Sequence, residues 1–243
     1  MDRNDFTKKL IIGHRGAPRL ARENTLFSFQ KAVEMGCDGL ELDVRRTKDG
    51  IFIAHHDAYI GNSRITDLLY IQVLEITKKL GYEVSRIKDV AENIPETVLL
   101  NFELKEEGYE KEFIDSVSNY RDLRAFVVSS FYPRVIIEIK RLFPNIRTGL
   151  LLGPWVSILY QTFSKGDFRY FYQSLFFRKH AVAVADFLIP HIFCAKGWFK
   201  NSQNKPLWIW ESLRQNTKKE TFLKLMEHDE VEAVIVNSPE NFV

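Results

Sequence analysis

Eight short runs rich in strand-forming apolar residues recur along the chain, and segments with helical periodicity separate them. The runs cover residues 10–13, 39–45, 98–105, 125–131, 147–152, 186–192, 206–211 and 232–237. Strands that alternate with helices favour a parallel sheet, and eight such strands suit a sheet closed into a barrel. We therefore predict an α/β fold, a (β/α)8 barrel.

The length and composition favour one globular domain. A barrel of this type routinely occupies 243 residues, and 45% apolar with 27% charged residues is ordinary for a folded domain with a sizeable core. Linkers rich in proline, glycine or serine, internal repeats and low-complexity segments are absent from the sequence. We expect a single domain over residues 1–243.

Two segments show the helical period clearly, residues 23–35 and 110–120. Apolar side chains fall on one face of each, which is typical of helices outside a barrel. These side chains are Leu26, Phe29, Ala32 and Val33 in the first segment, and Phe113, Ile114 and Val117 in the second.

The second predicted strand carries two carboxylates on one face. Period-2 alternation places Glu41, Asp43 and Arg45 on the same side, with apolar residues on the other. Two carboxylates that point into a barrel are costly unless positive charge lies between them. Mg²⁺ or Ca²⁺ suits this position because both ions prefer oxygen ligands.

The third strand repeats this pattern with Glu103 and Lys105. Glu103 can complete the set of carboxylates, and Lys105 offers a point charge to a phosphate oxygen. Either pair alone is typical of a solvated strand face. Together, on neighbouring strands, the two pairs favour a site.

The first strand ends in His14, Arg15 and Gly16. Histidine exchanges a proton near neutral pH, arginine binds phosphate with two N–H groups, and glycine permits a tight turn. Asn24 and Thr25 follow at the opening of a helix, where either residue suits the helix cap.

A short strand at residues 51–55 follows a Lys-Asp-Gly turn, so we expect a hairpin with the second strand that brings His56 toward Glu41 and Asp43. Cleavage that activates a nucleophile and protonates a leaving oxygen needs two proton carriers, which His14 and His56 can supply. The three histidines at 180, 191 and 228 fall outside this cluster, and we interpret them as surface or structural residues.

Taken in order, these motifs resemble the signature series of the glycerophosphodiester phosphodiesterase family. The series comprises residues 13–18 (Gly-His-Arg-Gly-Ala-Pro), 23–25 (Glu-Asn-Thr), 41–44 (Glu-Leu-Asp-Val), 48–50 (Lys-Asp-Gly), 56–57 (His-Asp) and 103–105 (Glu-Leu-Lys). The resemblance is most specific over residues 10–105. Residues 128–131, 207–210 and 235–239 resemble the later strand ends of the family.

The resemblance implies a TIM barrel that cleaves glycerophosphodiesters to glycerol 3-phosphate and an alcohol, a phosphoric diester hydrolase. It also implies a role for each motif residue: metal binding by Glu41, Asp43 and Glu103, acid/base catalysis by His14 and His56, phosphate binding by Arg15 and Lys105, and the glycerol side for Trp210.

Two late positions depart from the family pattern. The family usually has Thr-Asp where this chain has Val236 and Asn237, and it tends to have Thr where this chain has Glu211. Because neither position belongs to the metal or acid/base set, we expect them to affect substrate choice on the glycerol side.

The aromatic and basic residues of 155–180 allow two interpretations. They form a loop and helix that pack over the barrel rim, or they contact a membrane surface or an acyl chain. The second interpretation favours lysophospholipase D or phospholipase C-like activity on lipid phosphodiesters. A binding barrel without activity is the third class, against which the intact motifs argue.

The charge balance and the cysteines restrict partners and location. Thirty-four basic and 32 acidic residues leave a net charge of +2, which disfavours nucleic acid as a partner. Cys37 and Cys194 have no zinc-ligand or disulfide-framework spacing. Apolar stretches are too short to span a bilayer, and the N-terminus is unlike a signal peptide. We expect a cytoplasmic protein, with peripheral membrane contact only through 155–180, acting on a small-molecule substrate.

Overall fold

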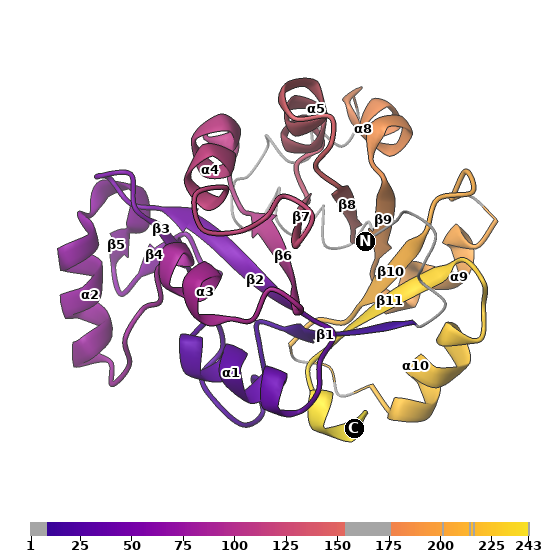
Figure 1. The fold of residues 1–243 in the computed structure, drawn as a ribbon, viewed down its shortest axis with the longest axis horizontal. Coiled ribbons are helices and arrows are strands. Elements are labelled where there is room, and N and C mark those ends of the chain that lie inside the picture. The colour runs from indigo at the N-terminus through magenta and orange to yellow at the C-terminus, as the bar shows by residue number, and fades with distance from the viewer. Residues whose placement is uncertain (1–8, 154–175, 201, 214, 216, 243) are drawn as a thin grey trace.

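The computed structural model describes residues 9–153, 176–200, 202–213, 215 and 217–242, and these residues contain a closed barrel of eight parallel strands (Figure 1). In chain order the strands are β1 (Leu10–His14), β2 (Gly39–Arg46), β6 (Leu99–Leu104), β7 (Phe126–Ser130), β8 (Thr148–Leu152), β9 (Phe187–Pro190), β10 (Leu207–Trp210) and β11 (Val231–Val236). Strand β1 pairs with both β2 and β11, and this pairing closes the sheet. The predicted (β/α)8 TIM barrel is confirmed.

Each predicted run coincides with one barrel strand. The predicted hairpin is also present, because β3 (Phe52–Ala54) pairs antiparallel with β2 and sets Val44 opposite Ala54. The assignment of residues 1–243 to one domain stays a prediction, since residues 154–175 lie outside the described part of the chain.

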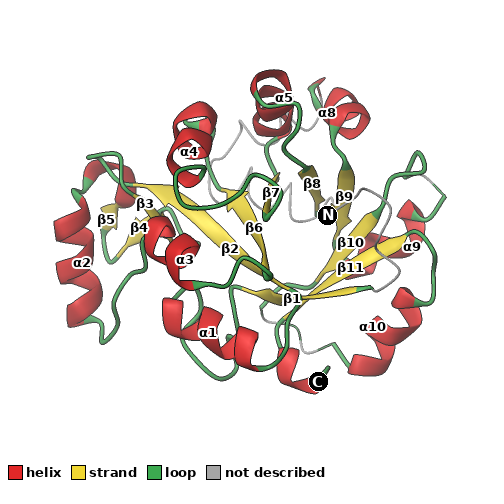
Figure 2. Ribbon diagram, in the orientation of Figure 1, coloured by secondary structure: helices red, strands yellow, loops and turns green. Residues whose placement is uncertain are grey.

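Helices surround the strands (Figure 2). They are α1 (Leu26–Glu34), α2 (Tyr70–Lys79), α3 (Ile87–Asn93), α4 (Glu110–Val117), α5 (Pro133–Leu142), α8 (Arg178–Val184), α9 (Ala195–Trp198) and α10 (Lys219–Met226), with short 3-10 helices at Ile65–Asp67, Ile192–Cys194 and Pro239–Asn241. A small hairpin of β4 (Tyr59–Ile60) and β5 (Ser63–Arg64) lies with α2 beside the ring of strands (Figure 1).

Helix α1 begins later than predicted. Asn24 has a φ of +55°, a left-handed conformation that cannot continue into a helix. Thr25 is the cap, since its hydroxyl oxygen accepts a hydrogen bond of 3.2 Å from the backbone N–H of Ser28. The helix therefore starts at Leu26, and the prediction of a start at residue 23 was wrong.

The two faces of the strands meet different surroundings. Leu40, Leu42 and Val44 of β2 point outward and are fully buried in a cluster that includes Phe29 of α1 and Phe113 of α4, as the alternation predicted. Full burial of each such side chain stabilises the fold by about 1.5–3 kcal/mol.

A second apolar cluster contains interior residues of the barrel strands. Phe187 stacks on Trp208 with ring centroids 4.2 Å apart, and both are fully buried together with Ile12 and Ile235. Apolar side chains fill this layer, and the buried carboxylates of β2 and β6 lie further along the strands, toward the carboxyl ends.

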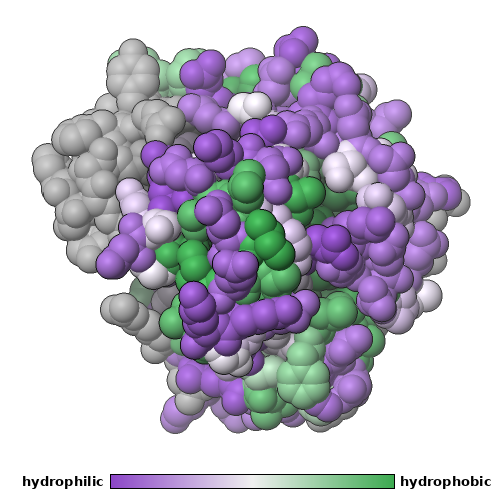
Figure 3. All heavy atoms as spheres, turned by 90° about the vertical axis from the view of Figure 1, so that its left-hand side faces the viewer, coloured by the Kyte–Doolittle hydropathy of each residue, from purple (hydrophilic) through white to green (hydrophobic). Residues whose placement is uncertain are grey.

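The side of the molecule that carries α2 is largely hydrophilic, with apolar residues gathered near its centre (Figure 3). The large hydrophobic residues exposed on α2, next to it or on β4 are Tyr59, Leu69, Ile71 and Leu80. Among the helices described, none combines the length and the apolar character needed to cross a membrane.

Gly149 of β8 offers a test of the interior packing. A Cβ atom at this position would collide with the ring of Phe187 and lie 2.8 Å from Cδ1 of Ile189. We predict that Gly149→Ala lowers the free energy of unfolding by about 1–3 kcal/mol, because the close-packed barrel interior has no space for the added methyl group. Urea unfolding measures the difference.

The matched control is Gly197→Ala in α9, where no described atom lies within 4 Å of the added carbon. We expect an unchanged stability or a gain of up to about 1 kcal/mol from the better helix former. Equal losses in the two variants would contradict the packing described for β8.

Candidate active site

The predicted metal-binding and acid/base residues of the motifs lie at or near the carboxyl ends of three adjacent strands, β1, β2 and β6. The register of β1 on β2 sets His14 beside Glu41, and that of β2 on β6 sets Asp43 beside Glu103. In a TIM barrel this end of the strands carries the active site. The structure thus brings together residues that the sequence distributes over three motifs.

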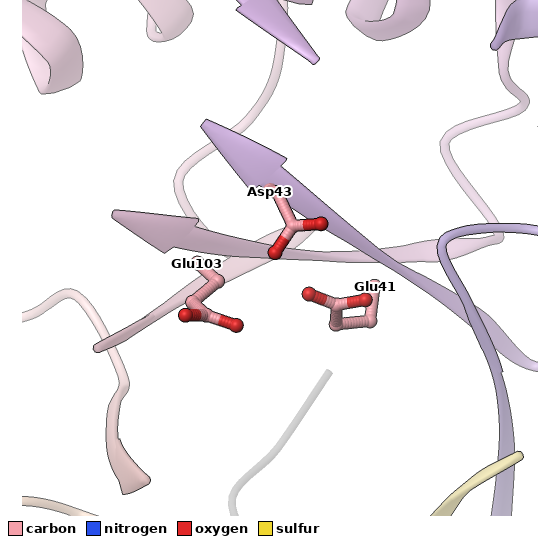
Figure 4. Close-up of side chains that lie close together, drawn as sticks. All are labelled: Glu41, Asp43 and Glu103. Carbon is pink, nitrogen blue, oxygen red and sulfur yellow. The ribbon is translucent and has the colours of Figure 1, made fainter. Parts of the chain in front are cut away.

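Three carboxylates converge at the carboxyl ends of the barrel strands, which form the mouth of the barrel (Figure 4). Glu41, Asp43 and Glu103 are 3%, 0% and 6% exposed, and each offers an oxygen within 4.8 Å of the others. Burial, reinforced by the charges of the other two carboxylates, raises the pKa of Glu41 well above its ordinary value. The cluster therefore requires positive charge close by.

Two cationic side chains supply part of that charge. Lys105 Nζ lies 2.6 Å from Glu103 Oε1 and 3.0 Å from Asp43 Oδ1, and Arg15 Nε lies 3.0 Å from Asp43 Oδ2. Burial acts to raise the pKa of Asp43, but Arg15 and Lys105 outweigh it and hold the pKa well below its usual range. Asp43 is accordingly ionised.

The carboxylate cluster can also hold a metal ion. Glu41 Oε1 is buried and has no hydrogen-bond partner within the described part of the chain. An orphaned carboxylate oxygen beside two further carboxylates is a costly arrangement that a cation relieves. The donor set consists of oxygen atoms alone, which fits a hard divalent cation.

Arg15 connects the carboxylates to the loop after β1. The residue has a φ of +56°, and its backbone N–H donates a hydrogen bond of 3.0 Å to Glu41 Oε2. Its guanidinium also donates to Glu23 Oε1 at 2.9 Å. Sequence reasoning did not find this role of Glu23.

Asn24 holds Asp43 from two sides. Its side-chain amide donates to Asp43 Oδ2 at 2.7 Å, and its Oδ1 accepts from the backbone N–H of Asp43 at 3.2 Å. Asn24 was one of two candidates for the helix cap, but Thr25 fills that position. The available signal was the place of residues 23–25 within the ordered series of motifs.

His14 is buried at the end of β1. Its Nδ1 lies 2.7 Å from Asn237 Oδ1, and its Nε2 lies 3.8 Å from Glu41 Oε2. Burial, and then the charge of Arg15, lowers the pKa of His14 to about 3. The imidazole is therefore neutral near pH 7, and one of its two ring nitrogens carries no hydrogen.

His56 lies near the opening, with its side chain 37% exposed. Its Nδ1 is 2.9 Å from Asp57 Oδ1. Arg45 holds the backbone carbonyl of His56 with two N–H groups, at 3.1 and 2.7 Å, and is itself paired with Glu106 at 2.6 Å. The predicted face of β2 thus includes a residue that positions His56.

Trp210 lies at the same mouth, at the end of β10. Its ring meets His14 edge-on at 6.4 Å between centroids, Phe131 at 5.5 Å and His191 at 4.6 Å. The indole Nε1 is buried without a hydrogen-bond partner among the described residues. Trp210 therefore presents an indole N–H next to His14 that has no partner in the described part of the chain.

The two late departures from the family pattern lie closer to the chemistry than expected. Glu211 is 2% exposed, and its carboxylate accepts hydrogen bonds from the backbone N–H groups of Asn237 at 3.1 Å and Thr217 at 3.0 Å. Asn237 in turn contacts His14. Asn237 therefore lies next to a residue of the predicted acid/base pair, and Glu211 holds the backbone of Asn237 and Thr217 by hydrogen bonds. The expected effect of the two positions on substrate choice stays a prediction.

A TIM barrel with three buried carboxylates, two cationic side chains and two histidines at the carboxyl ends of its strands has the features of an enzyme active site. Residues 14–157, more than half of the chain, match the model of the glycerophosphoryl diester phosphodiesterase family. The chain belongs to this family and is an enzyme of the phosphoric diester hydrolase class.

Individual relatives agree with this assignment. A glycerophosphodiester phosphodiesterase of Caldanaerobacter subterraneus subsp. tengcongensis is 29% identical over 61% of this chain and 70% of its own length. A crystal structure of a glycerophosphodiester phosphodiesterase from Thermotoga maritima shares the fold with a TM-score of 0.67, 23% identity and 97% coverage of both chains.

A further structural relative is a phosphodiesterase of Oleispira antarctica in complex with its product sn-glycerol 3-phosphate. It has a TM-score of 0.72 and 20% identity, and the match covers 96% of this chain and 94% of that one.

Because Glu41 Oε1 has no hydrogen-bond partner among the described residues, metal binding at this oxygen can be tested by its effect on the stability of the protein. We predict that Mg²⁺ or Ca²⁺ raises the midpoint of thermal unfolding and that EDTA reverses the effect, with about 2.7 kcal/mol gained at a hundredfold excess over the dissociation constant. The shift disappears in Glu41→Gln, which removes one ligand charge.

Glu110→Gln is the control, because Glu110 is also a buried glutamate whose pKa is raised by burial, but it lies on α4 outside the carboxylate cluster. This variant keeps the full cation effect. A shift of equal size in Glu41→Gln would place the bound ion elsewhere.

Proposed function

We propose that this enzyme hydrolyses glycerophosphodiesters to glycerol 3-phosphate and an alcohol, with a divalent cation held at the barrel mouth. The observation that carries the proposal is the buried cluster of three carboxylates with two cationic side chains among them. Membership of the family and the product-bound relative support the choice of substrate.

The charges of the site suit a phosphodiester. Three carboxylates against Arg15 and Lys105 leave one negative charge in excess. Glu23, which also pairs with Arg15, adds to this excess. A divalent cation held by the carboxylates offsets the negative charge and so favours an anionic phosphodiester, which the carboxylates alone repel.

The ligands of Mg²⁺ or Ca²⁺ in this proposal are Glu41, Asp43 and Glu103. When bound, the cation neutralises a phosphoryl oxygen and polarises the attacking hydroxyl or water. Lys105 and Arg15 lie against the same carboxylates, within reach of a phosphate bound there. Lys105 contributes a point charge and Arg15 a planar pair of donors.

Two proton transfers accompany the cleavage. His14 presents Nε2 beside Glu41, and His56 lies on the open side of the mouth. One histidine takes the proton of the attacking hydroxyl or water, and the other protonates the departing oxygen. Trp210 lies beside His14, and its indole N–H has no hydrogen-bond partner among the described residues. This N–H can donate to the glycerol portion of the substrate.

Activity on lysophospholipids was tied to residues 155–180, and most of that segment lies outside the described residues. Lipid-directed activity, membrane contact through this segment and a cytoplasmic location stay predictions.

The direct test is release of glycerol 3-phosphate from glycerophosphocholine and glycerophosphoethanolamine in the presence of Mg²⁺, Ca²⁺ or EDTA. We expect metal-dependent release that falls by roughly 10²–10⁴-fold in His14→Ala, because a positioned proton carrier contributes that much. Glu41→Ala abolishes release by removing a metal ligand.

His228→Gln is the control, since His228 stacks on Phe199 away from the carboxylate cluster, and its activity stays at the level of the unmodified enzyme. Folded protein that releases no glycerol 3-phosphate with either ion would contradict the proposed substrate. Release of choline from lysophosphatidylcholine by the same sample would instead support the lipid-directed alternative.

A further inference from the structure

Asn237 joins two parts of the mouth that are far apart in the sequence. It follows β11, is 1% exposed, and its Oδ1 lies 2.7 Å from His14 Nδ1 across 223 positions of the chain. Its Nδ2 lies 2.9 Å from the carbonyl oxygen of Ser212 and 3.3 Å from that of Gln215, both in the loop between β10 and α10.

The partners of Asn237 determine how its amide is oriented. Carbonyl oxygens only accept hydrogen bonds, so the NH2 group of the amide faces Ser212 and Gln215. The amide oxygen then faces His14, and it too can only accept. The hydrogen in the short contact must therefore belong to Nδ1 of His14.

A neutral imidazole carries one N–H, so Nε2 of His14 bears a lone pair. This is the nitrogen that lies 3.8 Å from Glu41 Oε2, on the side of the carboxylate cluster. We propose that Asn237 is a positioning residue that holds His14 as the Nδ1–H tautomer, so that Nε2 accepts the proton, and that it couples this state to the β10–α10 loop. The catalytic consequence rests on the function proposed above.

Asparagine suits position 237 because its NH2 group can donate hydrogen bonds to the carbonyl oxygens of the β10–α10 loop. An aspartate at 237, as the family usually has, still accepts from Nδ1–H but turns an oxygen toward the carbonyl groups of Ser212 and Gln215. Glu211 fastens the same loop, accepting from the backbone of Asn237 and Thr217. The two departures from the family pattern thus belong to one hydrogen-bonded unit.

His191 provides a control within the same mouth. Its Nε2 lies 2.9 Å from Gln215 Oε1, and its Nδ1 accepts a hydrogen bond from the backbone N–H of Phe193 at 3.3 Å. Because Nδ1 accepts, Nε2 carries the hydrogen, so His191 is the opposite tautomer. It is also buried, at 4% exposure.

The two tautomers can be read by long-range ¹H–¹⁵N correlation NMR of the full chain labelled at histidine, in buffer with EDTA. His14→Gln assigns the signals of His14. We expect Nδ1–H for His14 and Nε2–H for His191. Asn237→Leu converts His14 to the Nε2–H form and leaves His191 unchanged, whereas Asn237→Asp keeps Nδ1–H at His14.

Either of two results overturns the proposal: an Nε2–H tautomer of His14 in the unmodified protein, or an Nδ1–H tautomer that persists in Asn237→Leu while His191 keeps its signals. Because this measurement uses neither substrate nor metal, it decides the role of Asn237 even if the proposed substrate fails.

Kinetics then connect the tautomer to the reaction. We expect Asn237→Leu to lower kcat by roughly 10²-fold with a much smaller change in KM, because the lost contribution is proton transfer and not substrate binding. Asn237→Asp recovers part of kcat. A rise of KM alone, or an equal loss of kcat in the aspartate and leucine variants, contradicts the positioning role.

Asn93→Leu is the matched control, because it makes the same substitution at an exposed asparagine of α3, whose amide donates to the backbone carbonyl of Asp89 at 2.8 Å and leaves the contact between Asn237 and His14 in place. We expect its kcat to equal that of the unmodified enzyme.

Discussion

The repulsion among Glu41, Asp43 and Glu103 is the constraint on which the rest of this mouth depends. Three carboxylates buried within 4.8 Å of one another do not persist without positive charge. Arg15 and Lys105 neutralise part of that charge, and Glu41 Oε1, which has no hydrogen-bond partner among the described residues, is free to bind a cation. The same excess of negative charge that destabilises the fold is what recruits the metal in the proposed reaction.

The polar side chains of the mouth are held by partners from other elements. The side chain of Asn24 donates a hydrogen bond to Asp43, Asn237 contacts His14, and Arg45 donates to the backbone carbonyl of His56. The contact of Asn237 with His14 joins the ends of the last and first strands and depends on closure of the barrel, whereas Arg45 reaches His56 within one hairpin. Groups held in this way need little reorganisation when charge develops during the reaction.

Much of this arrangement could be predicted from the sequence. The alternation along β2 and β6 predicted which side chains share a face, and the parallel register places Asp43 beside Glu103. The orientation of Asn24 could not be read from periodicity, because it depends on a left-handed turn. The contact of His14 with Asn237 spans the closure between the first and last strands, where the pattern of a single strand carries no information. Placing the ends of β1 and β11 side by side in the predicted barrel was the signal that could have found it.

In the proposed site, one cation and one phosphate bind together at the carboxylate cluster. A crystal structure of the protein soaked with Ca²⁺ and glycerol 3-phosphate would show both. We expect an ion with oxygens of Glu41, Asp43 and Glu103 at roughly 2.3–2.6 Å, and a phosphate oxygen on both the ion and Lys105. An ion bound away from these carboxylates, or a phosphate bound outside the barrel mouth, would contradict the proposed site.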